Sequence, residues 1–311
     1  MNTNGREYLL DCLAAIERTN PAGVEHELLV LDNASTDGSA DAVRERHPDA
    51  RLFALERRAG KADNDSLLLR EARGRWCLLL NEDSELREGA VRALLDALES
   101  DPAAAVAGAQ LLTSGGEPTP CAWRLPDIPW ALAAAVFMQD RVAVESTGES
   151  VREVGWVQSS AVLVRREAAE QVGWLDGDSF VYSDETDFCN RVRDAGWRIL
   201  FVPGARAVHH DQLGTDSEAM ARRIVEFHRN RDRYFRKHGL TATRLVWKAC
   251  WTWAYLARAA VAALLPGRDA RRYLLHARQE LFPGCGEGIR EAAEAHNRAL
   301  ANNVPARHGA R

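Results

Sequence analysis

The stretch Leu78-Leu-Leu-Asn-Glu-Asp-Ser-Glu85 is an apolar run that ends abruptly in a cluster of carboxylates. Residues 76–80 have the short apolar pattern of a buried strand. A buried parallel strand delivers the residues after it to the carboxyl edge of the sheet, where open α/β sheets bind ligands. Glu82, Asp83 and Glu85 are therefore expected at the mouth of a crevice, where their oxygens suit Mg²⁺ or Mn²⁺ and a diphosphate. The alternative is an acidic loop that caps and opens a helix.

The composition limits the classes to which this chain can belong. Its 311 residues suffice for one large domain or two small ones. The net charge of −5 gives no reason to expect a nucleic-acid partner. Six cysteines lack CxxC spacing, which argues against a zinc site or a disulfide framework and fits a reducing compartment. The first residues, 1–7, contain no apolar signal region.

On both sides of the opening strand, strand patterns alternate with helix patterns. Strands are predicted at 27–31, 51–55, 76–80 and 106–111, and helices at 6–18, 40–46, 64–72 and 88–98. This alternation predicts an α/β fold with a mostly parallel central sheet flanked by helices. Farther along, the patterns predict an irregular insertion at 113–151, a strand at 156–164 with a polar dent at 158–160, a helix that opens at 184 and a strand at 197–202.

Four motifs follow one another along the chain. They are Leu31-Asp-Asn-Ala-Ser-Thr-Asp-Gly-Ser39, Leu78-Leu-Leu-Asn-Glu-Asp83, Tyr182-Ser-Asp-Glu-Thr-Asp-Phe-Cys-Asn-Arg191, and Pro203 followed by His209. In this order they resemble the family 2 glycosyltransferases, and within them the rhamnosyltransferase-type branch, over about residues 4–216. The resemblance implies a GT-A fold, in which a Rossmann-like nucleotide-binding α/β half is merged with an acceptor half. It also implies inverting transfer from a nucleotide-diphospho sugar with a divalent metal, Mg²⁺ or Mn²⁺.

The resemblance implies a nucleotide site. Asp32 and Asn33 would contact the nucleotide, and Asp37 would shape its pocket. Lys61 lies where the family reaches toward the base or the diphosphate. Its surroundings follow the family pattern only loosely, so a solvated surface charge is the alternative for Lys61.

The resemblance also implies a metal site beside the diphosphate. The run Asn81-Glu82-Asp83 takes the place of the family's Asp-x-Asp motif. Asn81 and Glu82 would then face the nucleotide sugar, and Asp83 would be the metal ligand. His209 matches a family histidine near the metal and the diphosphate, whereas His210 beside it is expected to be structural.

The catalytic base is expected at the pair Asp184-Glu185, which takes the place of the family's Glu-Asp pair. Since the order is reversed here, the base could be Glu185, Asp184 or Asp187. Helix capping is the alternative for the two aspartates. Asp187 and Trp156 are also candidates to face the acceptor, with core packing the alternative for Trp156. One carboxylate suffices for inversion because the attacking hydroxyl has one proton to lose, and a metal, a lysine or helix-end N–H groups can stabilise the departing diphosphate.

The first residues raise a question about the sheet. The family begins with an apolar strand that lies inside the sheet, and this chain starts where that strand should end. Its absence is expected to leave unpaired ladder groups and an exposed apolar flank. We therefore expect the true start to lie upstream; the alternative is a truncated, inactive protein. Asn2 and Thr3 are either the remnant of a nucleotide-contacting turn or a frayed terminus.

The carboxyl-terminal third is predicted to be helical. The basic segment 226–237 could meet anionic lipid headgroups or a pyrophosphate acceptor, although a solvated face also explains such charge. The segment 245–265 is apolar and rich in tryptophan, but Lys248 and Arg258 interrupt it. This pattern favours an interfacial helix over a spanning one, with a helix packed on the catalytic domain as the alternative. Residues 304–311 are predicted to be a disordered tail.

These patterns predict a division of the chain and a function. A GT-A domain is expected at 1–240, with a nucleotide-binding half at 1–112 and an acceptor half at 113–240, followed by a helical extension at 241–303. The predicted enzyme is a cytoplasmic glycosyltransferase, peripheral at the inner face of the plasma membrane, that acts on a glycan or lipid-linked acceptor. The alternatives are a non-catalytic nucleotide-sugar-binding or scaffold protein and a nucleotidyltransferase. The latter would need a glycine-rich basic phosphate loop near the amino terminus, which the sequence lacks.

Overall fold

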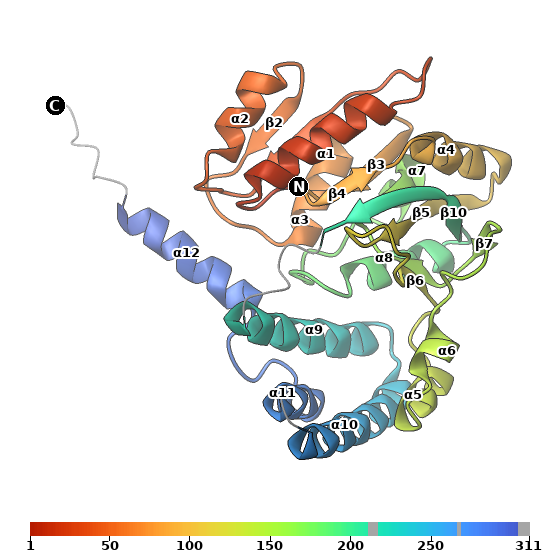
Figure 1. The fold of residues 1–311 in the computed structure, drawn as a ribbon, viewed down its shortest axis with the longest axis vertical. Helices are drawn as coiled ribbons and strands as arrows, with labels where there is room; N and C mark the ends of the chain where they lie inside the picture. Colours follow the sequence, from red (N-terminus) through yellow and green to blue (C-terminus); the bar gives the residue numbers. More distant parts are fainter. Residues whose placement is uncertain (211–216, 266–268, 304–311) are drawn as a thin grey trace.

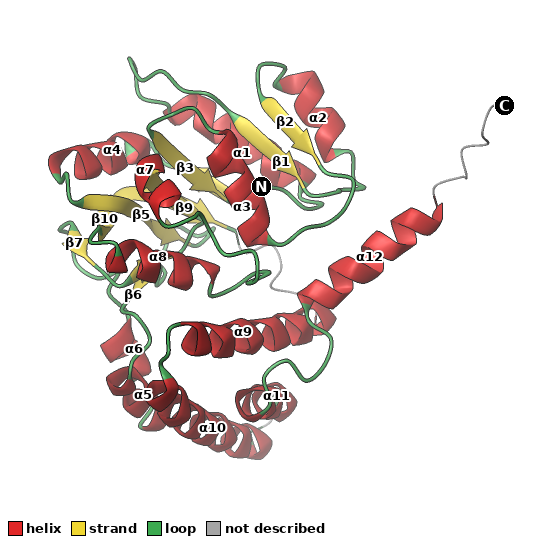
Figure 2. Cartoon of the chain, turned by 180° about the vertical axis from the view of Figure 1, so that it is seen from behind, coloured by secondary structure: helices red, strands yellow, loops and turns green. Residues whose placement is uncertain are grey.

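The computed structural model describes residues 1–210, 217–265 and 269–303. The predicted tail at 304–311 lies outside the described residues, as does the stretch 211–216 that ends the family resemblance. An α/β part contains the sheets, and helices of the carboxyl-terminal third pack against its lower side in Figure 1. Helix α12 leaves this body at one side, as both Figure 1 and Figure 2 show.

The secondary-structure elements are as follows. The strands are β1 (Leu29–Asp32), β2 (Arg51–Ala54), β3 (Trp76–Leu80), β4 (Ser84–Leu86), β5 (Ala104–Leu112), β6 (Ala122–Trp123), β7 (Arg152–Glu153), β8 (Trp156–Val157), β9 (Ala161–Arg165) and β10 (Arg198–His209). The helices are α1 (Arg6–Thr19), α2 (Ser39–Arg46), α3 (Lys61–Glu71), α4 (Ala90–Ser100), α5 (Ile128–Ala135), α6 (Gln139–Ala143), α7 (Arg166–Gln171), α8 (Asp184–Asp194), α9 (Ser217–Lys237), α10 (Thr241–Leu264), α11 (Ala270–Leu281) and α12 (Ile289–Asn303).

The central sheet has the strand order β3-β9-β5-β10-β4, with β7 paired to β10. Strands β3, β5 and β10 share one direction, because β3 and β5 are both antiparallel to β9 and β10 is parallel to β5. The sheet is therefore mixed, and the prediction of mostly parallel pairing is wrong. A parallel return needs a crossover, usually a helix packed on the sheet. The chain between β5 and β9 instead forms the insertion, and it returns to the sheet as β9, which runs antiparallel to β3 and β5.

Strand β5 forms the middle of the core. All nine of its residues are buried, as expected for a strand that is covered on both faces. Gly108 within it lies under β8, where an added Cβ would come 2.6 Å from the Cβ of Val157. Only glycine lets β8 approach this closely, so this position fixes β8 onto the sheet.

Strands β1 and β2 form a separate two-stranded parallel sheet. An apolar slot of about 450 Å³ lies between β1 and β3, lined by residues such as Leu13, Val30 and Leu78. This slot coincides with the apolar flank that the sequence predicts. Asn2 lies at the end of this slot and is fully buried. It pairs with β1 through two hydrogen bonds of 2.8 Å: its N–H donates to the Leu31 carbonyl, and its carbonyl accepts the Asn33 N–H. The first residues are therefore not a frayed terminus.

The helices of the carboxyl-terminal third pack on one another and on α5. The predicted basic segment lies in α9, and the alternative of a solvated face describes only part of it, since Arg233 and Arg236 are exposed. Glu226, His228, Asn230 and Arg231 are all buried there, because α10, α11 and α12 cover the helix. The apolar segment forms most of α10. In the described part of the chain, no helix has the length and apolar character needed to cross a membrane.

Candidate active site

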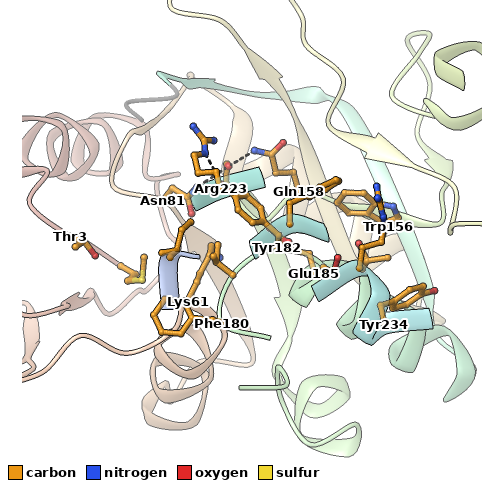
Figure 3. Close-up of a pocket in the computed structure, with 18 of the residues that line it drawn as sticks. Thr3, Lys61, Asn81, Trp156, Gln158, Phe180, Tyr182, Glu185, Arg223 and Tyr234 are labelled. Carbon is orange, nitrogen blue, oxygen red and sulfur yellow. Dashed lines mark hydrogen bonds between the residues drawn. The ribbon is translucent and has the colours of Figure 1, made fainter. Parts of the chain in front are cut away.

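A cavity of about 630 Å³ lies where the sheet edge meets the helices. Figure 3 shows it from Thr3 and Lys61 at one end, past Tyr182 and Glu185, to Trp156 and Tyr234. Eight predicted site residues line it: Asn33, Lys61, Asn81, Glu82, Asp83, Trp156, Glu185 and His209. Four predicted site residues are not among its lining: Asp32, Asp37, Asp184 and Asp187. The structure thus brings together residues from all four sequence motifs.

Asp83 and His209 contact each other at the wall of this cavity. Strand β4 pairs with the end of β10 and sets Ser84 opposite His209. The Asp83 carbonyl also accepts the N–H of His210 over 2.9 Å. These contacts bring Oδ1 of Asp83 to 3.3 Å from Nε2 of His209. Because the residues after Asp83 form a strand, the alternative in which the acidic run opens a helix is wrong.

The chemistry of this pair suits a divalent cation that is shared with a substrate. A carboxylate oxygen and an imidazole nitrogen are both ligands for Mn²⁺-type ions. Among the residues that the structure describes, no group of three or more His, Cys, Asp or Glu could hold a metal alone. Such a two-ligand site is typical of Mg²⁺, which binds one or two carboxylates together with substrate phosphates. Asp83 and His209 therefore fit a metal completed by a diphosphate.

Glu185 lies in the first turn of α8 and lines the cavity. The hydroxyl of Ser159 donates to its Oε1 over 2.8 Å, and the Lys61 ammonium donates to that hydroxyl over 2.8 Å. Lys61 also forms an ion pair with Asp65. Burial alone would lower the pKa of Lys61, but the carboxylates of Asp65, Asp184 and Glu185 outweigh it and raise that pKa. Lys61 is therefore a buried, charged partner of this chain of groups, and the alternative of a solvated surface charge is wrong.

A close backbone contact brings Lys61 to the base motif. Its N–H donates to the Phe180 carbonyl over 2.7 Å, so the start of α3 lies against the loop before α8. A Cβ on Gly60 would come 2.9 Å from that same carbonyl oxygen, so a larger residue would push the two segments apart. Tyr182 and Ser183 in this loop have positive φ values of 67° and 59°. The loop therefore bends sharply just before it delivers Glu185.

Asp184 and Asp187 flank Glu185 on α8 but have different surroundings. Asp184 is fully buried, and neither of its carboxyl oxygens meets a hydrogen-bond donor in the described part of the chain. Burial and the neighbouring charge of Glu185 raise its pKa well above the usual range. Asp187 instead contacts Arg191, Lys237 and His238 at 2.8–2.9 Å. Burial opposes its ionisation, but these contacts outweigh burial and lower the pKa of Asp187.

The loop after β1 forms the end of the cavity where the nucleotide is expected, called the nucleotide end below. The amide of Asn33 donates to the Ala59 carbonyl and accepts the Ala59 N–H over 2.8 Å. Asp32 is buried behind it and accepts from Asn2 and from the Ser35 N–H. Asp32 therefore holds the loop that presents Asn33.

Asp37 holds the same loop to α1. Its two oxygens accept the N–H groups of Arg6 and Ser39, each over 3.0 Å. Partial burial opposes ionisation, but these bonds and that from the Ser39 hydroxyl outweigh it and lower the pKa of Asp37. Asp37 thus shapes the loop rather than the cavity surface.

Asn81 and Glu82 connect the nucleotide end to the base. The Asn81 amide donates to the hydroxyl of Ser160 over 3.0 Å. The Glu82 carboxylate accepts the Thr3 N–H over 3.3 Å, and burial raises its pKa. Thr3 therefore belongs to the wall of this site.

Trp156 forms part of the opposite wall. Its ring stacks on Trp123 with centroids 4.4 Å apart, through the pairing of β6 with β8. The predicted strand at 156–164 is split here into β8 and β9, and the polar dent between them supplies Ser159 and Ser160. Core packing alone does not describe Trp156, because this residue also lines the cavity.

Several cavity residues were not predicted as site residues. Tyr182, Arg223 and the aromatic residues of α9 and α10 were not predicted to face this cavity. A signal exists in α10, where aromatic residues recur at a spacing of four, which places them on one helix face.

Comparisons with known proteins agree with this geometry. The model of "Glycosyl transferase family 2" matches residues 2–128, and that of "Glycosyl transferase family group 2" matches residues 76–271. N-acetylglucosaminyl-diphospho-decaprenol L-rhamnosyltransferase of Mycobacterium tuberculosis, from two strains, is 31% identical over 215 residues. That match covers 60% of this chain and 67% of the relative.

Two solved structures share the fold. A mannosyltransferase from Pyrobaculum calidifontis, in complex with GDP-Man and Mn²⁺, has a TM-score of 0.55 at 20% identity, covering 97% of this chain and 84% of that one. GalNAc-T7 with UDP, GalNAc and Mn²⁺ has a TM-score of 0.56 at 15% identity, covering 97% of this chain and 56% of that one. These likenesses bear out the expected GT-A fold.

Proposed function

This chain belongs to glycosyltransferase family 2, and from that premise we propose that it inverts the anomeric centre of the sugar it transfers. The donor is a nucleotide-diphospho sugar, and the acceptor is a hydroxyl of a lipid-linked or polysaccharide glycan. The observation that carries this proposal is the shared cavity of Glu185 and the Asp83–His209 pair. In this cavity, the Glu185 carboxylate is suited to remove a proton. The separate Asp83–His209 pair is suited to hold a cation beside a diphosphate.

Glu185 is the proposed base. As the acceptor oxygen bonds to the anomeric carbon, its proton passes to the Glu185 carboxylate and the bond from that carbon to the diphosphate oxygen breaks. Ser159 holds Oε1 of Glu185, which leaves Oε2 to take the proton. Asp184 is buried outside the cavity lining, which supports Glu185 over Asp184 as the base. The ion pairs of Asp187 support a structural role, so we omit it from the acceptor site.

Asp83 and His209 are the proposed holders of Mg²⁺ or Mn²⁺. Such an ion supplies Lewis-acid stabilisation of the charge that develops on the departing diphosphate. Both structural neighbours were solved with Mn²⁺, which supports a divalent ion without distinguishing the two metals. The residues themselves contribute the position, since β4 and β10 fix the two side chains on neighbouring strands.

The nucleotide is proposed to bind at the end formed by Asn33, Asn81 and Glu82. Asn33 and Asn81 offer amide donors and acceptors at the cavity wall. Asp32 and Asp37 act indirectly, because their oxygens hold the loop that carries Asn33. These contacts fix the shape of the pocket before the donor arrives, which reduces the cost of ordering it on binding.

Lys61 is proposed to position the base rather than to contact the nucleotide. Its ammonium is engaged by Asp65 and by the hydroxyl of Ser159. Because that hydroxyl then donates to Glu185, the bond from Lys61 fixes the group that orients the carboxylate of the base.

The acceptor is proposed to be lipid-linked, as the name of the rhamnosyltransferase relative describes for that enzyme. Trp156 supplies a flat ring on which an acceptor sugar can lie. The face of α10 that points away from the cavity exposes apolar side chains, including Leu256, Val261 and Leu264. We propose that this face, within 245–265, contacts the inner surface of the plasma membrane, so that the enzyme works peripherally from the cytoplasm, where nucleotide sugars are supplied.

The proposed division of labour follows the sequence boundaries. Residues 1–112 bind the nucleotide, residues 113–240 supply the base and the acceptor wall, and the extension at 241–303 closes the acceptor end. Isothermal titration of UDP, GDP and dTDP, each with and without Mn²⁺, tests the donor site. Tight binding of one nucleotide only with Mn²⁺ is expected. Failure of all three under both conditions would remove the donor site and with it the proposed function.

A further inference from the structure

The helical end of the cavity is walled by one face of α10. Trp247, Trp251 and Tyr255 all line the cavity, and they recur every four residues, which places them on the same side of the helix. Their rings form a continuous row, with centroids 5.7 Å apart between Trp247 and Trp251 and 5.5 Å apart between Trp251 and Tyr255. This row lies beyond the sheet, at the end of the cavity opposite the nucleotide.

Helix α9 supplies the second wall with the same spacing. Arg223, Phe227 and Arg231 lie four residues apart and all line the cavity, as does Tyr234. Two guanidinium groups therefore alternate with aromatic rings along this face. Arg223 is fixed by a bond from its Nε to the Tyr182 hydroxyl over 2.7 Å, next to the base loop.

Apart from the two arginines, the wall at this end of the cavity is apolar. Trp130 of α5 packs edge-on against Trp247 with centroids 5.1 Å apart. The indole nitrogens of Trp130, Trp247 and Trp251 are buried within the packing, so the ring carbons rather than the N–H groups form the cavity wall. The Tyr234 hydroxyl is engaged by Asn190. Such a wall suits a hydrocarbon chain better than a sugar, whose hydroxyls would lose water without finding partners.

The outer side of the same helix is also apolar. Trp253, two residues from Trp251, is 58% exposed, and Leu264 is 84% exposed. Leu132 of α5 and Phe137, which follows that helix, are also exposed. Helix α5 lies beside α10, since the Trp253 indole donates to the Ala135 carbonyl over 3.1 Å. Helix α10 therefore separates an internal aromatic chamber from an external apolar surface.

We propose that this chamber binds the apolar aglycone of the acceptor next to its diphosphate. The ligand is an isoprenoid-type chain joined to the acceptor sugar by a diphosphate, with Arg223 facing the diphosphate and the rings of α9 and α10 contacting the first chain carbons. Arg231 is paired with Glu280 and therefore belongs to the wall of the chamber. The sugar then lies between the diphosphate and Glu185, against Trp156. This inference rests on the proposed function, because it presumes that the acceptor hydroxyl reaches Glu185.

Farnesyl diphosphate is a soluble probe of this chamber. Its binding is measured by equilibrium dialysis with the donor site filled by the preferred nucleoside diphosphate and Mn²⁺. Trp251→Ala is expected to weaken binding about tenfold through loss of a ring contact. Trp253→Ala is the matched control, since that ring lies on the outer side, and it should leave binding unchanged. Inorganic pyrophosphate should compete only weakly, because it lacks the chain.

The outcomes separate this inference from the proposed function. If the full chain binds a nucleoside diphosphate but not farnesyl diphosphate, the aglycone chamber is wrong and the transferase proposal stands. An equal effect of the two tryptophan variants would also overturn the chamber. If no nucleoside diphosphate binds, the proposed function itself fails. If Trp251→Ala still binds the nucleotide, the variant is folded. If that binding is lost, Phe227→Leu replaces it as a probe of the opposite wall. Unchanged farnesyl diphosphate binding by Phe227→Leu would contradict the chamber.

Discussion

The hydroxyl of Ser159 lies 2.8 Å from Oε1 of Glu185 and donates a hydrogen bond to it. The same hydroxyl accepts from Lys61, which is paired with Asp65. The contact joins residues from three separate segments of the chain, α3, the turn before β9 and the start of α8. It fixes one carboxylate oxygen and connects the base to a buried positive charge.

Ser159→Ala should lower kcat while leaving the KM for the donor unchanged. The hydroxyl holds Oε1 of Glu185, so its removal loosens the orientation in which the carboxylate takes the proton. Nucleoside diphosphate binding should stay unchanged. Ser159→Thr keeps the hydroxyl and should restore kcat. An unchanged kcat in Ser159→Ala would count against this positioning role.

Asp184→Asn should retain transfer and stabilise the protein at high pH. In the folded state burial and Glu185 raise the pKa of Asp184, whereas the unfolded chain ionises it at its usual value of about 4. As pH rises above that value, ionisation of Asp184 in the unfolded chain lowers the free energy of unfolding. Asparagine does not ionise, so the variant lacks this loss of stability. Melting temperatures at pH 5 and pH 8 should show a gain that is larger at pH 8. Loss of transfer with an intact fold would reopen the choice of base.

Asp187→Asn should destabilise the fold by roughly 2 kcal/mol at neutral pH, because it removes the charge of a buried carboxylate that is hydrogen-bonded to Arg191 and Lys237. Lys237, Arg191 and His238 lower the pKa of Asp187 in the folded state despite its burial. Its contribution is therefore present above the unfolded pKa and is lost as pH falls through the folded one. Urea unfolding at pH 7 and pH 3 measures this difference. Asp41→Asn removes an exposed helical pair with Arg44 and should change little.

Asp83→Asn should remove the effect of Mn²⁺ on nucleoside diphosphate binding. Removing a direct metal ligand should weaken metal affinity by more than roughly tenfold, which is the lower limit for removing a residue that only contacts a ligand. Calorimetry with and without Mn²⁺ measures the effect. Glu85→Gln is the control, since Glu85 contacts His210 and does not line the cavity. An unchanged metal response in Asp83→Asn would exclude the proposed ligand.

The elements around β3 could be predicted because their signals are local. An apolar run followed by carboxylates defines a strand and its carboxyl end, and the motif order indicates the family. Whether Asp184 or Glu185 faces the cavity could not be predicted, because it depends on the helix phase set by the bend at Tyr182 and Ser183. The contact of Lys61 with Ser159 joins residues 98 positions apart and leaves no local pattern.

The carboxyl-terminal helices show the same limit. The charges of α9 follow the pattern of a solvated face, yet Arg231 and Glu280 pair in the interior. Tertiary packing of α11 against α9 decides this burial. By contrast, the aromatic spacing of α10 marks one face in the sequence, although only the structure shows that this face meets a cavity.

Transfer by Glu185→Gln tests the central claim most directly. The measurement is acceptor-dependent release of nucleoside diphosphate from UDP-, GDP- and dTDP-sugars with Mn²⁺ and an N-acetylglucosaminyl-diphospho-lipid, for wild type and variant. Glutamine matches the size of glutamate but cannot take the proton, so the variant should bind the donor normally and lose on the order of 10²–10⁴-fold in rate. A variant that binds the donor and transfers at the wild-type rate would contradict the assignment of Glu185 as the base.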